Sequence, residues 1–144
     1  MIKKLTLALT ALLAIACSAE PEPKVMVGND RDAHNCISSA GYTWSNVRQA
    51  CIRLWEEGTA LTPVTEIENP VLVGYVVRSA NWKEAEIFLP NMKGSVVLTL
   101  QPVPDQTQWV SEDGQWQLFY SEKQGWLLTQ NGVAVYQAGP QEDN

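Results

Sequence analysis

The chain has 144 residues, a formal net charge of −6 and 45% hydrophobic residues. This length suits one compact domain, or a small module on one domain, and the acidic charge argues against nucleic acid and anionic lipid surfaces as partners. The single histidine allows no convincing catalytic triad, so we expect neither an enzyme nor a cofactor.

Residues 1–16 have the pattern of a secretory signal peptide. Lys3 and Lys4 give a positive start, and the apolar stretch of about a dozen residues behind them is too short to span a bilayer. The segment Leu13-Ala-Ile-Ala-Cys17 resembles the lipobox of bacterial lipoproteins, which implies cleavage before Cys17 and lipid on its thiol. Ordinary cleavage after Ala19 is the alternative.

The residues behind Cys17 are predicted to be an exported body held to a membrane by lipid. Because no later segment is apolar enough to span a bilayer, the lipid on Cys17 would be the anchor, at the outer membrane or cell surface. Loss of Lys3 and Lys4 leaves a formal charge of −8. That charge favours a basic protein partner. The polar, proline-rich residues 17–33 are predicted to be a flexible tether, with a short strand at 25–27 as a weaker expectation.

Residues 34–66 are predicted to form a module closed by a disulfide. Lipidation of Cys17 leaves Cys36 and Cys51 as the remaining pair in an oxidising compartment. Their bond would close a loop of about 15 residues and stabilise the fold by about 3 kcal/mol.

A short helix is predicted inside this module, over residues 46–52. Ser45 is its candidate N-cap, and Val47, Cys51 and Leu54 recur at helical spacing on one face. So short a helix is unstable alone, and we expect the disulfide and the two neighbouring tryptophans to hold it.

From Val71 onward the hydrophobic period changes to two, which is typical of strands. The expected strands cover residues 72–77, 84–89, 95–100, 115–120, 127–129 and 133–136. Asp113-Gly114 and Asn131-Gly132 supply the chemistry of tight turns. About six or seven short strands predict a small antiparallel β-barrel or sandwich over 71–138. A disordered tail is expected at 139–144.

Two resemblances add to this reading. Cys36-x-x-Ser39-x-Gly41-Tyr42-x-Trp44, followed by Cys51-Ile52-Arg53, resembles a short cysteine motif of small exported bacterial proteins, often lipoproteins. That motif implies no activity.

Residues 83–137 resemble the membrane-bound inhibitors of c-type lysozyme, small periplasmic lipoproteins with a β-barrel. The resemblance runs through Ala85–Leu89, Val97–Leu100, Trp109, Asp113-Gly114, Leu118–Ser121 and Trp126–Leu128. It implies a barrel and a basic protein partner such as lysozyme.

The inhibitory residues of that family are altered here. In the family, a loop serine and a lysine behind the aromatic strand carry inhibition. Asp105 stands at the serine's place, Glu122 at the lysine's place, and Lys123 is displaced by one position. The family's terminal cysteines are also missing, so we expect the fold without strong inhibition. The candidate partner-binding residues are Asp105, Trp109, Lys123 and Trp126.

Other polar groups are read as ordinary surface features. Asp30, Asp32 and His34 could ligate a metal, but their spacing matches no standard metal loop, so a solvated loop is favoured. Glu84 and Glu86 share a strand face and could form the carboxylate pair of a glycoside hydrolase. Solubilising charges are the favoured interpretation.

The six tryptophans allow two interpretations. Exposed rings would form a platform for glycans or peptides, whereas core packing is the commoner use in small β-domains and is favoured here. The sequence therefore predicts a non-enzymatic envelope lipoprotein with a protein-binding module. The alternatives are a structural or assembly lipoprotein and a glycan-binding module.

Overall fold

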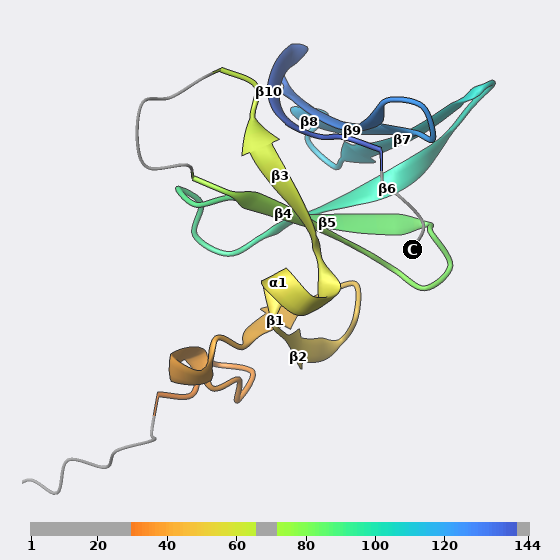
Figure 1. Ribbon diagram of the computed structural model, residues 1–144. Helices are drawn as coiled ribbons and strands as arrows, with labels where there is room; N and C mark the ends of the chain where they lie inside the picture. The colour runs from red at the N-terminus through yellow and green to blue at the C-terminus, as the bar shows by residue number, and fades with distance from the viewer. Residues whose placement is uncertain (1–29, 66–71, 141–144) are drawn as a thin grey trace, which may run out of the picture.

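The computed structural model describes residues 30–65 and 72–140. Eight strands close into an antiparallel barrel in the order β10-β3-β4-β5-β6-β7-β8-β9 (Figure 1). They are β3 (Thr59–Pro63), β4 (Gly74–Arg78), β5 (Glu84–Phe88), β6 (Val96–Val103), β7 (Gln106–Ser111), β8 (Trp116–Ser121), β9 (Gly125–Gln130) and β10 (Val133–Ala138). The prediction of a mainly β fold with a small antiparallel barrel is confirmed.

The barrel contains two strands that the sequence pattern did not reveal. β3 falls in the segment that the sequence grouped with the disulfide module, yet it pairs with both β4 and β10 and so closes the barrel. β7 lies where the sequence predicts no strand, and it pairs with β6 and β8.

The barrel interior is packed with side chains that alternate along most of the strands, with an irregularity in β10 between Ala134 and Tyr136. Its completely buried members include Leu61, Ala85, Ile87, Leu98, Trp109, Leu118 and Leu128. Interior layers of this kind leave the alternate positions to face outward, so each strand also presents an outer face.

The N-terminal segment covers part of that outer face, against β4 and β5 (Figure 1). It consists of the 3-10 turn η1 (Ser38–Ala40), the hairpin β1 (Thr43–Ser45) and β2 (Ala50–Ile52), and the short helix α1 (Leu54–Glu57). Ile52 packs against Val77 and Phe88, which point outward from the barrel. The segment therefore has a small hydrophobic core shared with the barrel wall.

The predicted helix over 46–52 is wrong. Those residues form the turn and second strand of a hairpin in which Trp44 pairs with Cys51. Gln49 has a φ of 52°, a left-handed conformation that ends any helix. The Ser45 hydroxyl accepts the N–H of Arg48 at 3.2 Å, so it caps a turn rather than a helix.

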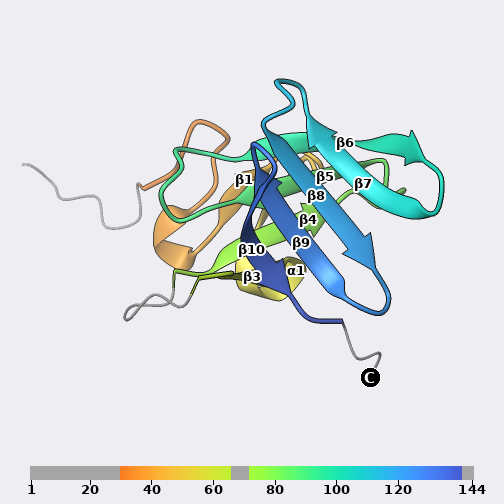
Figure 2. The same cartoon turned by 90° about the horizontal axis from the view of Figure 1, so that it is seen from above.

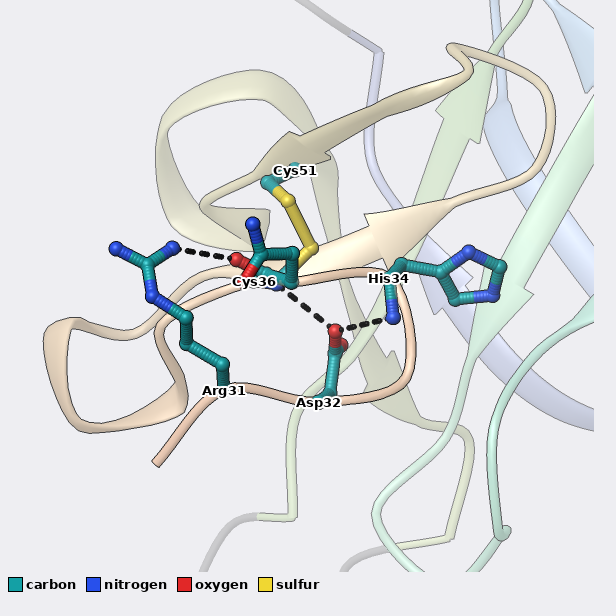
Figure 3. Close-up of a disulfide and its surroundings, with 6 residues drawn as sticks. Arg31, Asp32, His34, Cys36 and Cys51 are labelled. Carbon is teal, nitrogen blue, oxygen red and sulfur yellow. Dashed lines mark hydrogen bonds between the residues drawn. A yellow bond between two sulfur atoms is a disulfide. The ribbon is translucent and has the colours of Figure 1, made fainter. Parts of the chain in front are cut away.

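The disulfide between Cys36 and Cys51 is confirmed (Figure 3). Beside it, Asp32 Oδ1 accepts the backbone N–H groups of His34 at 2.8 Å and Cys36 at 2.9 Å. Arg31 donates to the carbonyl of Asn35 at 2.8 Å. Residues 30–32, which the sequence assigned to the tether, are thus hydrogen-bonded to the disulfide segment.

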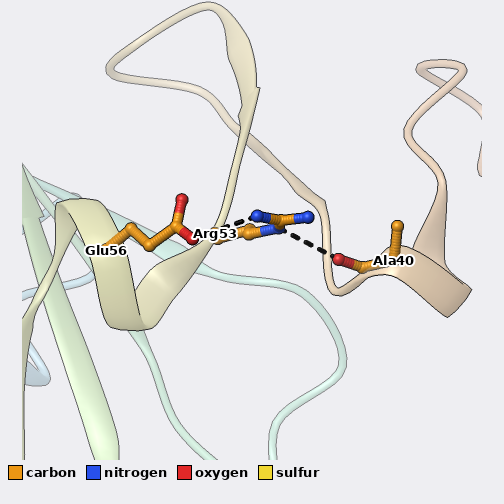
Figure 4. A network of polar contacts seen from close by, with 3 residues as sticks. All are labelled: Ala40, Arg53 and Glu56. Carbon is orange, nitrogen blue, oxygen red and sulfur yellow. Dashed lines mark hydrogen bonds and ion pairs between the residues drawn. The ribbon is translucent and has the colours of Figure 1, made fainter.

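A second set of contacts joins η1 to α1 (Figure 4). Arg53 Nε donates to the carbonyl of Ala40 at 3.1 Å, and its guanidinium pairs with Glu56 at 3.0 Å. The same guanidinium lies 4.6 Å from the ring centre of Tyr42. A Cβ on Gly41 would meet the Trp55 ring at 2.0 Å. Most residues of the cysteine motif therefore have structural roles.

Candidate functional site

Three turns meet at one end of the barrel, because antiparallel strands bring alternate turns to the same side. They are the β4–β5 turn at 79–83, the β6–β7 turn at 104–105 and the β8–β9 turn at 122–124. The last two are seen at the same side in Figure 2. We call this end the hairpin-tip end.

The hairpin-tip end brings together two of the four predicted binding residues. Asp105 is exposed at the β6–β7 tip with a φ of 60°, and Lys123 is exposed at the β8–β9 tip. An open groove of about 500 Å³ lies between the tips, lined by Asp105, Phe119, Gln124 and Leu127 among others. Phe119 and Leu127 give it an apolar floor, and Lys123 precedes Gln124 at its edge.

The other two predicted binding residues are internal. Trp109 and Trp126 have exposed fractions of 0% and 1%, so neither can contact a partner, and that part of the prediction is wrong. Their rings stack with centres 5.5 Å apart beneath the tips. Trp109 Nε1 also donates to the backbone carbonyl of Trp82 at 2.9 Å. They support the hairpin-tip end from inside.

Sequence reasoning missed two residues at this end, Arg78 and Trp82. The Arg78 guanidinium lies 3.5 Å from the Trp82 ring centre, and Trp82 is 40% exposed. Burial lowers the pKa of Arg78, and the charge of Arg48 acts in the same direction. The available signal was the strand period, which places Arg78 in phase with the buried Val76 and therefore inward.

Glu86 corrects the interpretation of the strand carboxylates as solvated charges. It is completely buried, whereas Glu84 is exposed, so the two do not form a pair around a substrate. Glu86 Oε2 accepts Ser45 Oγ at 2.6 Å and the N–H of Val47 at 3.2 Å. Oε1 accepts the backbone N–H of Asn46 at 3.1 Å, its side-chain amide at 2.9 Å, and the hydroxyl of Ser95.

This network holds the N-terminal hairpin on the barrel. Four of the five hydrogen bonds to Glu86 come from residues 45–47, and the fifth comes from the barrel loop after β5. A carboxylate has about four acceptor positions, so protein donors satisfy the whole hydrogen-bonding capacity of this buried group. Its role in the described part of the chain is structural.

The polar loop at residues 30–34 has a structural role as well. Asp30 accepts the N–H of Ser39, and hydrogen bonds to Ser39 lower the pKa of Asp30. The His34 ring stacks on Trp44 with centres 4.4 Å apart. Over residues 30–65 and 72–140, no three His, Cys, Asp or Glu side chains are grouped as metal ligands would be.

No helix within the described ranges is long and apolar enough to cross a membrane. No protein-family model matches the chain, and neither a curated protein nor a solved structure matches it.

Proposed function

We propose that the protein is a non-enzymatic lipoprotein of the cell envelope that binds another protein through the hairpin-tip end of its barrel. The observation that carries the proposal is the groove between neighbouring tips, with Asp105 on one tip and Lys123 on the other. An apolar floor flanked by charged tips offers a buried contact area together with polar groups that fix orientation. The lipobox at Cys17 supports the envelope location.

The partner is expected to be basic. The charge of −8 left after removal of residues 1–16 would attract a cationic protein over long distances and speed its association. A c-type lysozyme is the candidate that the resemblance of residues 83–137 suggests. Asp105 and Glu122 would bring two carboxylates toward the carboxylates of a lysozyme cleft, and such like-charge contacts cost several kcal/mol at an interface. Inhibition should therefore be weak.

Site-specific photo-crosslinking in intact cells tests the docking surface. A photoreactive residue at Leu127, in the groove, should give a discrete adduct with one envelope protein. The matched control is Val133, which is 66% exposed in the turn region at the opposite end. Absence of an adduct at Leu127, or equal adducts at both positions, would overturn the proposal.

A lysis assay tests the lysozyme assignment separately. The mature chain carrying Cys17→Ser, which removes the lipid, is added to lysozyme and bacterial cells at micromolar concentration. We expect little protection of the cells. Strong inhibition that disappears in Lys123→Ala but persists in Lys93→Ala would show that the displaced lysine still acts, and that the protein is an inhibitor.

Glycan binding through tryptophans is a weaker alternative. Trp109 and Trp126 are buried, and Trp82 is covered on one side by Arg78 and packed against Trp109, with ring centres 6.3 Å apart. Trp55, at 59% exposure, is the most exposed of the described tryptophans, but it lies in the N-terminal segment away from the groove. A stacking platform for sugars is therefore not supported at the hairpin-tip end.

A further inference from the structure

A second cavity, of about 520 Å³, lies between the N-terminal segment and the loop that joins β5 to β6. Both sides contribute to its lining, among them Trp44, Leu54, Phe88, Met92 and Lys93. We call it the seam cavity. Its volume is in the range of small-molecule sites, which often lie between two structural units. The β5–β6 loop is at the end of the barrel opposite the hairpin-tip end, so the seam cavity is separate from the groove between the tips.

Much of the lining of the seam cavity is apolar. Its aliphatic and phenyl members are Leu54, Phe88, Leu89 and Met92. Phe88 and Leu89 are each 9% exposed, and Met92 is partly buried against the barrel core. The unbranched thioether of a methionine adapts its shape to a neighbouring group. This side of the cavity can therefore bury the apolar body of a ligand.

A pair of stacked rings gives the cavity a preformed wall. The His34 ring points away from the disulfide (Figure 3) and lies on the Trp44 ring, with centres 4.4 Å apart and planes 6° from parallel. The backbone N–H of His34 donates to Asp32 at 2.8 Å, which fixes the loop that carries the imidazole. Both rings line the cavity. A ligand would therefore find this wall in place before it binds.

Most other polar groups around the cavity already have partners within the protein. Asp32 Oδ1 accepts two backbone N–H groups, which directs that carboxylate toward the disulfide segment (Figure 3). The Asn46 amide and the Ser95 hydroxyl both donate to Glu86. Lys93 is exposed, and its ammonium forms no hydrogen bond or ion pair among the residues that the structure describes. Lys93 is thus the cation in this lining that is available to a ligand.

We propose that the seam cavity binds a small organic acid with an aliphatic body, whose carboxylate pairs with Lys93 and whose chain packs on Leu54 and Met92. One cation beside an apolar lining complements one negative charge on an apolar chain. The formal net charge of −6 disfavours a ligand with several negative charges. This inference goes beyond the function proposed above, since both the ligand and the surface are different.

Titration with octanoate, followed by NMR of the methionine methyl signals, tests the site. Residues 17–144 carrying Cys17→Ser are labelled at these methyl groups, and Met92→Leu identifies the Met92 signal. We expect that signal to shift to saturation. 1-Octanol has the same chain without the charge, and it should bind about fivefold more weakly, which is the loss expected for one ion pair near the surface. A Met92 signal that does not saturate with octanoate would overturn the proposal.

Three substitutions separate the ion pair from the apolar contact. Lys93→Gln should weaken the binding of octanoate about fivefold and leave that of 1-octanol unchanged. Met92→Gln makes the lining polar and should weaken the binding of both. Lys83→Gln is the matched control, because it removes an exposed cation at the hairpin-tip end and should change neither midpoint. Equal affinities of the wild-type protein for the two ligands, or equal effects of Lys83→Gln and Lys93→Gln, would refute the role of Lys93.

Two further measurements exclude other occupants of the cavity. N-acetyl-leucine carries the carboxylate and the apolar side chain of a peptide C-terminus, and it should bind more weakly than octanoate. Tighter binding of N-acetyl-leucine would assign the cavity to a peptide end and contradict the proposal. A dimer that octanoate dissociates in size-exclusion chromatography would instead place a second copy of this chain in the cavity. Failure of the crosslinking experiment at Leu127 would leave the octanoate titration unaffected.

Discussion

Replacing Glu86 by glutamine should loosen the N-terminal hairpin from the barrel. The amide has the size of the carboxylate but puts an NH₂ group where one acceptor oxygen stood. In one orientation the N–H of Val47 loses its acceptor, and in the other the backbone and side-chain donors of Asn46 lose theirs. At least one buried backbone donor is therefore left unpaired, at a cost of about 1–3 kcal/mol.

The other contributions of this substitution to the free energy of unfolding partly cancel. Hydrogen bonds to a neutral amide are weaker than those to a carboxylate, which lowers stability further. A neutral amide is easier to bury than a charge, which offsets some of this loss. We expect Glu86→Gln to lower the free energy of unfolding by about 2 kcal/mol, or the melting temperature by about 6–10 °C for a domain of this size.

The assay is urea unfolding of residues 17–144 carrying Cys17→Ser, followed by tryptophan fluorescence. Glu84→Gln is the matched control, because it removes the same charge from the same strand at an exposed position. That control should stay within about 0.5 kcal/mol of the parent protein. Equal effects of the two substitutions would refute the role given to the buried network.

Three further predictions concern the cysteines and one turn carboxylate. Replacing Cys36 and Cys51 together by serine should cost about 3 kcal/mol in the same urea assay, since the bond spans 15 residues of sequence; an unchanged midpoint would contradict this. Cys17→Ala should abolish labelling by a palmitate analogue in cells, and persistent labelling would contradict Cys17 as the lipid anchor. Hydrogen bonds from the Ser111 side chain and the N–H of Gln115 lower the pKa of Asp113. Ionised Asp113 therefore contributes stability above its unfolded pKa of about 3.9, and this is lost as the pH falls through the lower folded value. Asp113→Asn should flatten the acid side of a melting-temperature profile, and parallel profiles would show that the turn makes no such contribution.

The barrel was largely predictable because most of its strands carry a period-two signal. Ala85, Ile87 and Leu98 lie inside as that period requires. β3 was not predicted because Leu61 is its one completely buried side chain. A strand of five residues with one apolar buried position shows no detectable alternation in the sequence. β7 was not predicted because glutamine and threonine occupy the positions before the buried Trp109. Polar residues next to a proline-rich turn favour a loop over a strand.

The local environment of Glu86 was beyond sequence reasoning. Its phase places it on the outer face of β5, where charged residues normally meet water. It is buried because a hairpin about forty residues earlier lies over that face, a long-range contact that no local pattern encodes. The predicted helix failed for the same reason, since Ser45 and Asn46 donate to this carboxylate rather than start a helix.

The strand that completes the barrel is also the last of the strands in the described ranges. β10 pairs with β3 across a separation of 75 residues, from Thr62 to Gln137. Contacts so distant in sequence form late, after the entropy of a long loop has been lost. Until β10 docks, β3 and β9 each present an unpaired edge on which another chain can add. Docking of β10 is therefore the step at which the folding chain passes from an intermediate with two open strand edges, which is prone to aggregation, to a closed barrel.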